Sequence, residues 1–196
     1  MIVQSDRPTG PPRRYRLSTD QYERLAAVGV IPPDTRVELV DGELIEMPPM
    51  NPPHSAVVMR LDALWQRIAG QERAIRTSMP LKIDWDGEPW PDLVVLSRPI
   101  DDYATRHPLA AEALLVIEVS DTALDDDQKI KGPKYARAGV REYWVVDING
   151  DRVWVYTEPG AAGYGFRHAY HRGESVSPLA FPDVAIAVEA ILGPPR

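Results

Sequence analysis

The sequence predicts an α/β or α+β domain in which helices cover the faces of a mixed β-sheet. Two near-continuous apolar runs, DLVVLS at residues 92–97 and LLVIEV at residues 114–119, are typical of central strands covered on both faces. One segment with helical spacing of apolar residues precedes these runs, and a second helix candidate follows them. Segments in which apolar and polar residues alternate around a tight turn predict one β-hairpin before the two apolar runs and one after them. This order of elements excludes a helix bundle and a β-sandwich.

The 196 residues fit one domain, which we place over residues 17–192. Residues 1–16 predict a flexible arm, because proline suits neither helix nor sheet interiors. The arginines at the end of this arm either contact phosphate or only keep the arm soluble. The residues concerned are Pro8, Pro11, Pro12, Arg13, Arg14 and Arg16.

The first elements of the domain are predicted to be a short helix and a hairpin. Ser18 and Gln21 have the spacing of a capping box, which predicts a helix over residues 19–28. In RVELVDGELIEM, apolar and polar residues alternate on both sides of Asp41-Gly42. Because glycine readily adopts the positive φ of a tight turn, this pattern predicts a hairpin.

A proline-rich loop leads to a helix predicted from His54 to Ala69, and strands then dominate. The strands are expected at residues 75–84, 92–97 and 114–119. A further helix is expected over residues 127–138, with Gly132-Pro133 as a kink or a late start. EYWVVD and RVWVYT predict a second hairpin across residues 148–151, and residues 163–192 predict one or two edge strands and a short terminal turn.

The amino-acid composition excludes several classes of protein. The chain has no cysteine, which excludes disulfides and zinc–thiolate sites. No segment approaches the roughly 20 apolar residues of a membrane span, and the N-terminus lacks a signal-peptide core, so we expect a soluble cytoplasmic protein without membrane contact. The net charge of −7 argues against indiscriminate binding to polyanions, although a local basic surface remains compatible with it.

Two acidic residues stand at the ends of the central strands. Asp92 opens DLVVLS, and Glu118 lies near the close of LLVIEV. If the strands are antiparallel neighbours, both carboxylates meet at one edge of the sheet. An all-oxygen pair suits Mg²⁺, which proteins hold with carboxylates and water. The alternative is a pair of capping or salt-bridging acids.

The segments PDLVVL and LLVIEVSDTALDDDQKIKGPKYARAGVREYWVVD, together with VELVDGELIEM and the later His54, resemble the Uma2 (DUF820-like) family of restriction-type endonucleases. This family belongs to the PD-(D/E)xK nuclease superfamily, and the resemblance spans roughly residues 17–190. It implies a restriction-endonuclease-like mixed sheet flanked by helices, with an N-terminal hairpin and extra C-terminal edge strands. It also implies Mg²⁺-dependent hydrolysis of DNA phosphodiester bonds, with Mn²⁺ as the alternative to Mg²⁺.

The resemblance implies roles for individual residues. Asp92 and Glu118 match the metal-binding acids, and the main-chain carbonyl of Val119 is expected to add an oxygen ligand. The superfamily lysine would stand two residues after Glu118, where this chain has Ser120. In the Uma2 pattern the lysine has moved to the following helix, four residues before a tyrosine. That spacing selects Lys131, with Lys129 as the alternative.

The sequence allows two interpretations of the roles of Glu38 and His54. Glu38 is either a third acid at or near the metal or an ordinary exposed strand residue. His54 makes either a simple polar contact or a phosphate contact, for which Lys129 is a second candidate. Asp121, Asp125 and Asp127 are expected to cap the following helix.

Cleavage of both DNA strands requires two sites, which predicts a homodimer. The alternative function is a non-catalytic module that binds nucleic acid or protein and keeps the nuclease fold, as Ser120 and the acidic net charge favour.

Overall fold

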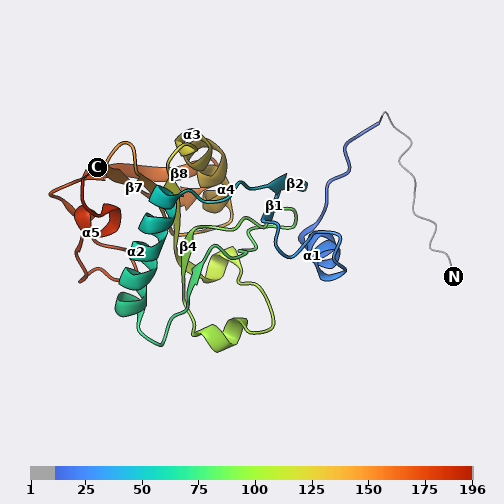
Figure 1. Ribbon diagram of the computed structural model, residues 1–196, viewed down its shortest axis with the longest axis horizontal. Helices are drawn as coiled ribbons and strands as arrows, with labels where there is room; N and C mark the ends of the chain where they lie inside the picture. Colours follow the sequence, from blue (N-terminus) through green and yellow to red (C-terminus); the bar gives the residue numbers. More distant parts are fainter. Residues whose placement is uncertain (1–11, 196) are drawn as a thin grey trace.

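The computed structural model describes residues 12–195 and contains a six-stranded mixed sheet with helices on both faces (Figure 1). Most of the arm expected over residues 1–16 lies outside the described residues. All neighbouring strands are antiparallel except β5 and β6, which run parallel. In their order across the sheet, the strands are β3 Ile75–Thr77, β4 Leu93–Leu96, β5 Ala113–Ser120, β6 Glu142–Asp147, β7 Arg152–Gly160 and β8 Gly163–His171.

The parallel pair β5–β6 requires a crossover, which one continuous helical segment supplies. It consists of α3 (Leu124–Asp126), a π-helical turn (Asp127–Lys131) and α4 (Gly132–Arg137). Pro133 has no N–H for the carbonyl of the residue four positions earlier, which explains the wider turn just before it. The helix therefore begins three residues before the predicted Asp127. Gly132-Pro133 lies inside it and is not a late start.

Side chains of alternate strand residues build a core on each face, as the period of two requires. On one face, Leu93 and Ile117 pack with Leu61 and Trp65 of α2 (Pro52–Ala69). The short helix α5 (Val188–Leu192) covers the same face through Val188, Ile191 and Leu192. On the other face, Val94, Val116, Tyr143 and Val145 pack with Tyr135 of α4. The two central strands are therefore buried on both sides, as predicted.

The N-terminal elements pack beside the segment that precedes β4. Helix α1 (Thr19–Ala27) begins with the predicted capping box, and β1 (Val37–Val40) and β2 (Glu43–Glu46) form the predicted hairpin. Asp41 and Gly42 both have positive φ, which confirms the tight turn. A bridge between Leu39 and Glu88 connects the hairpin to the segment before β4.

Two further predicted boundaries are wrong. Helix α2 begins at Pro52, not His54, because Asn51 caps it and proline fits the first helical positions. The strand expected over residues 75–84 ends at Thr77, since Ser78 has positive φ and Pro80 has no N–H for a sheet. The remaining short elements are the 3₁₀ turns Ile100–Tyr103 and Ala110–Glu112 and the two-stranded pair β9 (Ser175–Val176) and β10 (Ile186–Ala187).

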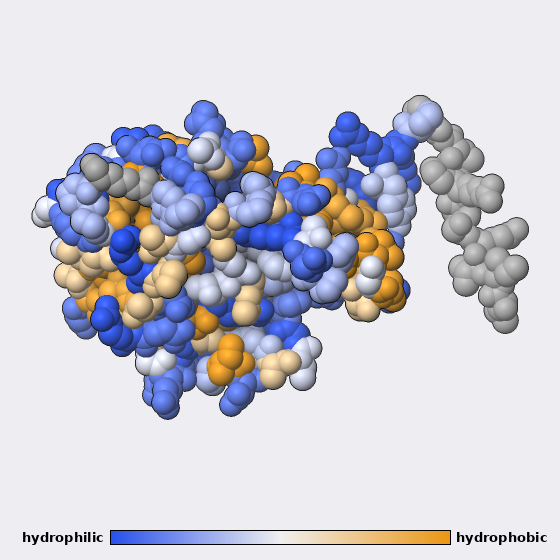
Figure 2. Space-filling view, in the orientation of Figure 1, coloured by the Kyte–Doolittle hydropathy of each residue, from blue (hydrophilic) through white to orange (hydrophobic). Residues whose placement is uncertain are grey.

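The face seen in Figure 2 is largely hydrophilic, with a group of hydrophobic residues over the region of α1. Val28 and Val30, directly after this helix, are exposed. Within residues 12–195, no helix combines the length and the apolar character that crossing a membrane requires.

Candidate active site

The two predicted acids meet at one end of the sheet. Strands β4 and β5 are antiparallel neighbours with Leu93 opposite Ile117, so the same register places Asp92 opposite Glu118. Asp92 is 3% exposed and Glu118 is 2% exposed. A buried carboxylate is unfavourable without partners, and each of the two has partners from a different helix.

Asp92 is held by the strand beside it and by the first turn of α2. Its Oδ2 accepts a hydrogen bond from the backbone N–H of Val119 at 2.8 Å and lies 3.1 Å from Nε2 of His54. Burial lowers the pKa of His54, but the hydrogen bond and the charge of Asp92 outweigh burial and raise that pKa above its ordinary value. His54 is fixed in turn because its backbone N–H donates to Oδ1 of the helix cap Asn51.

Glu118 is held from the other face of the sheet by the crossover helix. Its Oε1 accepts hydrogen bonds from Nζ of Lys131 at 3.0 Å and from the hydroxyl of Tyr135 at 2.8 Å. Burial raises the pKa of Glu118 to about 8, which the Lys131 ammonium opposes. Burial also disfavours charge on Lys131, but Glu118, Glu38 and Asp127 outweigh burial and raise its pKa. The surrounding carboxylates therefore favour the ammonium form of Lys131.

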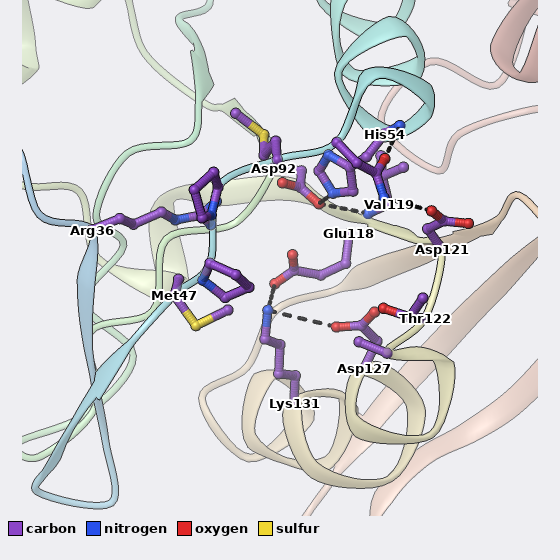
Figure 3. A pocket seen from close by; sticks show the side chains of 15 residues that line it. Arg36, Met47, His54, Asp92, Glu118, Val119, Asp121, Thr122, Asp127 and Lys131 are labelled. Carbon is purple, nitrogen blue, oxygen red and sulfur yellow. Dashed lines mark hydrogen bonds and ion pairs between the residues drawn. The ribbon is translucent and has the colours of Figure 1, made fainter.

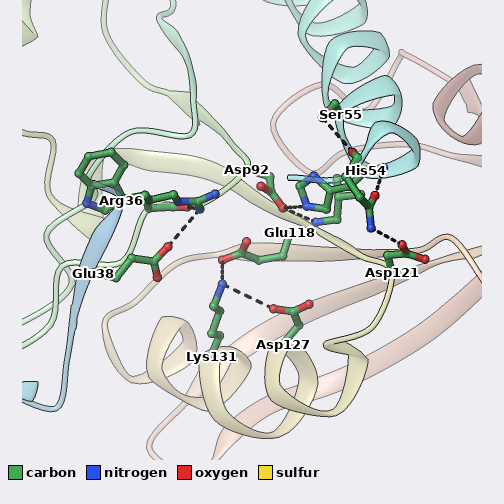
Figure 4. Close-up of polar contacts among 12 residues, drawn as sticks. Arg36, Glu38, His54, Ser55, Asp92, Glu118, Asp121, Asp127 and Lys131 are labelled. Atoms are coloured by element: carbon green, nitrogen blue, oxygen red, sulfur yellow. Dashed lines mark hydrogen bonds and ion pairs between the residues drawn. The ribbon is translucent and has the colours of Figure 1, made fainter. Parts of the chain in front are cut away.

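Asp127 is a third buried acid in this group, and the prediction that it caps a helix is wrong. It lies inside the helical segment, is 4% exposed, and its Oδ1 is 3.6 Å from Nζ of Lys131 (Figure 4). Burial raises its pKa to about 6, while Lys131 and the nearby Ser120 hydroxyl oppose the rise. The four-residue spacing to Lys131 was the signal that could have found it, because such residues share a helix face.

The neighbouring acids do not cap the helix either. Asp125 is exposed and forms an ion pair of 2.9 Å with Lys129, and Asp121 accepts a hydrogen bond from Asn51. The Lys129 side chain is 69% exposed, whereas that of Lys131 is 19% exposed and lines the pocket described below. The structure thus brings Lys131, and not Lys129, to the two acids.

Glu38 is buried, so its interpretation as an exposed strand residue is wrong. It is 1% exposed, and its Oε1 forms an ion pair of 3.0 Å with Arg36. The Arg36 guanidinium also donates to the carbonyl of Trp90 and lies between Glu38 and Asp92 in Figure 4. Arg36 lines the pocket, and Glu38 stands behind it. Sequence reasoning did not identify Arg36.

These side chains surround a pocket of about 160 Å³. Figure 3 shows Asp92, Glu118, Asp127 and Lys131 directed toward a common space, with Arg36 and His54 at its sides. The proline-rich segment before α2 and the start of the crossover form the remaining walls. The pocket therefore offers carboxylate oxygens, one ammonium and one guanidinium to a small charged ligand.

A different set of side chains comes closest to a preformed metal site. Among the described residues, the one group of three or more metal-binding side chains with ligand atoms within 4.8 Å of one another is Glu23, Glu88 and His107. These residues lie outside the pocket of Asp92 and Glu118. Inside that pocket, the Lys131 ammonium contacts both Glu118 and Asp127.

Comparison with known proteins gives a fold and a family. A solved structure from Anabaena variabilis ATCC 29413, described as "a putative nuclease belonging to DUF820", is similar with a TM-score of 0.70 and 14% identity, over 90% of this chain and 97% of that chain. This likeness confirms the predicted nuclease-like mixed α/β fold. No curated protein matches. The Uma2 family, described as "Putative restriction endonuclease", matches residues 19–189, which is most of the chain. The protein therefore belongs to the Uma2 family.

Proposed function

We propose that this chain is a divalent-metal-dependent endonuclease that hydrolyses DNA phosphodiester bonds in the pocket between Asp92 and Lys131. The observation that carries the proposal is the convergence of two buried strand carboxylates and one helix ammonium on a single pocket. The membership of the chain in a family described as restriction endonucleases supports the same reaction.

The residues of the pocket fit a divalent cation. The buried acids Asp92, Glu118 and Asp127 outnumber the buried ammonium of Lys131, and a bound cation would favour the charged forms of these acids. The donors are oxygens, which Mg²⁺ prefers and Mn²⁺ accepts. We assign Asp92 and Glu118 as the ligands. The N–H of Val119 points to Asp92, so its carbonyl faces the same side and adds a third oxygen.

When bound, the cation supplies Lewis-acid polarisation of the phosphoryl group and lowers the pKa of water. Lys131 orients the attacking water and offsets the negative charge that develops on the phosphate. It does so without reorganisation, because its ammonium is already held by Glu118 and Asp127. Tyr135 keeps the Glu118 carboxylate in place through its hydroxyl.

Arg36 and His54 are proposed to receive the DNA phosphate. Within residues 12–195, the buried Nε of Arg36 and Nδ1 of His54 have no hydrogen-bond partner, and both residues line the pocket. A guanidinium N–H directed at a phosphate oxygen forms a strong charge-assisted hydrogen bond. These two side chains would provide a local phosphate contact in a protein whose overall charge is −7. Glu38 would hold the Arg36 guanidinium in position through their ion pair.

Both strands of a duplex are cut when two such pockets face it, so we propose a two-fold symmetric homodimer as the active form. The proposed domain covers residues 17–192.

The test is cleavage of supercoiled plasmid by the purified protein with MgCl₂ or with EDTA. We expect nicked and linear products with Mg²⁺, and a loss of about 100-fold or more in rate for Asp92→Asn and Glu118→Gln. Asp125→Asn removes an exposed acid near the pocket and serves as the matched control. Equal cleavage by all three variants would contradict the proposal.

A non-catalytic binding module is the second candidate. Ser120 occupies the strand position of the superfamily lysine, and it is buried in the described structure. If the wild-type protein binds DNA with Mg²⁺ or Mn²⁺ present but never cleaves it, this second function replaces the first.

A further inference from the structure

A second pocket, of about 640 Å³, lies between α1, the segment before β4 and the loop around residues 103–107. Its wall carries Glu23 from α1, Glu88 from the bridge to the hairpin, and His107 from the loop. The nuclease function proposed above uses none of these residues. We propose that Glu23, Glu88 and His107 form a binding site for a divalent transition-metal ion of the Zn²⁺ class.

Glu88 is the observation that points to a ligand. This residue is 1% exposed, and among residues 12–195 neither of its carboxylate oxygens has a hydrogen-bond partner. Leaving a buried carboxylate without such partners is unfavourable by several kcal/mol, on the order of the desolvation penalty for one ion. Its side chain lines the pocket, so a cation that enters there would compensate for the lost hydration.

His107 stands beside this carboxylate at a distance that suits a shared ion. Its Nε2 lies 3.9 Å from Oε1 of Glu88, which is too long for a hydrogen bond. Two donors that each lie about 2.1 Å from one tetrahedral ion are separated by roughly 3.4 Å, which is about 0.5 Å less than the distance between these two atoms. The ligand atoms of all three residues lie within 4.8 Å of one another, so small side-chain rotations complete the set.

The donor set selects the class of metal. One imidazole and two carboxylates suit Zn²⁺ and similar transition metals, whereas Mg²⁺ is held by oxygens. Three protein ligands would leave a fourth position for water or another ligand. Lys82 forms an ion pair of 2.8 Å with Oε1 of Glu23, so the ion would use the other oxygen of that carboxylate or displace the lysine.

The three ligands come from separate parts of the chain, and a bound ion would therefore connect them. Glu23 belongs to α1, Glu88 is paired with Leu39 of the hairpin, and His107 lies in a loop. Metal binding is expected to raise the melting temperature, because the ion binds the folded arrangement and not the unfolded chain.

The test measures Zn²⁺ binding by calorimetry in a background that lacks the first pocket's ligands, Asp92→Asn with Glu118→Gln. We expect one equivalent of Zn²⁺ and a higher melting temperature on Zn²⁺ addition. His107→Ala in this background should weaken binding at least about 10-fold and abolish the thermal shift. His168→Ala, which removes an exposed histidine elsewhere, should change neither.

Three outcomes would overturn the site. They are no Zn²⁺ equivalent in the background protein, an equivalent that His107→Ala binds with unchanged affinity, or equal losses of affinity with His107→Ala and His168→Ala. Glu88→Gln is the second variant, and the far-ultraviolet circular dichroism of each variant shows whether it folds. Loss of Zn²⁺ binding in a folded Glu88→Gln variant supports the site. Plasmid cleavage plays no part in this test, so failure of the nuclease proposal would be seen separately.

Discussion

Nζ of Lys131 lies 3.0 Å from Oε1 of Glu118, although the two residues belong to different elements, a helical crossover and a central strand. Two positions after Glu118 the strand carries Ser120, whose hydroxyl is neutral and supplies no cation. The crossover after β5 returns along the same face of the sheet, and the long lysine stem reaches the carboxylate from there. The ammonium that contacts Glu118 therefore comes from the crossover helix and not from the strand.

The first prediction concerns the contribution of the Lys131–Glu118 ion pair to the free energy of unfolding. Lys131→Met should lower the free energy of unfolding by about 3 kcal/mol, because it leaves buried acids without their ammonium. Lys129→Met, which removes an exposed lysine two residues away, should change it by less than about 0.5 kcal/mol. Urea unfolding at pH 7 measures both. Similar losses in the two variants would contradict the assignment of Lys131 to the pocket.

The second prediction is that Glu118 and Lys131 are coupled. Glu118→Gln in the Lys131→Met protein removes the unpaired charge, so the double variant should be more stable than the sum of the single effects by about 1 kcal/mol or more. Strict additivity would show that the 3.0 Å contact contributes no interaction energy.

The third prediction separates two buried tyrosines. The Tyr135 hydroxyl donates to Glu118, whereas the Tyr143 hydroxyl donates to the backbone carbonyl of Asp127. Each substitution by Phe should lower stability by about 1 kcal/mol. Only Tyr135→Phe should raise the pKa of Glu118 further, because a hydrogen bond to the charged form lowers a carboxyl pKa. Carbon-detected NMR titration of the Glu118 carboxyl checks this, and equal pKa values in both variants would refute it.

Most of the fold could be predicted because its signals are local. Apolar runs identify strands buried on both faces, and Asp41-Gly42 identifies the hairpin turn. The strand expected to continue to residue 84 ends at Thr77, since a positive φ at Ser78 directs the chain out of the sheet. Periodicity does not reveal such a single change of backbone direction.

The site could be predicted only in part, for reasons of long-range packing. Asp92 and Glu118 stand out as charges at the ends of apolar strands. The burial of Glu38 depends on Arg36 and on the backbone of Trp90, which is far away in the sequence. Asp127 belongs to a run of three aspartates that resembles a helix start, and the helical turn that contains it ends at Lys131, just before Pro133.

The fourth prediction is that Asp92 raises the pKa of His54. Burial alone lowers this pKa, and the hydrogen bond and charge of Asp92 reverse the sign. In the wild-type protein His54 should therefore titrate above its ordinary value of 6.5, and in Asp92→Asn below its wild-type value. Nitrogen-15 NMR titration of the imidazoles measures both, with the exposed His168 as an internal control. An unchanged His54 titration in Asp92→Asn would contradict the 3.1 Å contact.

The fifth prediction concerns acid stability, and it involves the ion pair between Arg106 and Glu112. The Arg106 guanidinium donates two hydrogen bonds, of 2.6 and 2.7 Å, to the two carboxylate oxygens of Glu112. These hydrogen bonds lower the pKa of Glu112 to about 2 from 4.5. Because the folded-state pKa is the lower one, the stabilisation is complete above pH 4.5 and is lost as the pH falls toward 2.

Arg106→Gln should therefore flatten the dependence of the unfolding free energy on pH between 4.5 and 2. The comparison variant is Arg98→Gln: Arg98 forms a longer ion pair of 3.4 Å with Asp102, and its charge lowers the pKa of Glu112 less than Arg106 does, so this variant should flatten the curve less. The difference between wild type and Arg106→Gln should also shrink in high salt, because Arg106 is 42% exposed and its charge is screened. Urea unfolding at a series of pH values measures the effect. A pH dependence that is equally steep in wild type and Arg106→Gln would show that the ion pair does not hold Glu112 in its charged form.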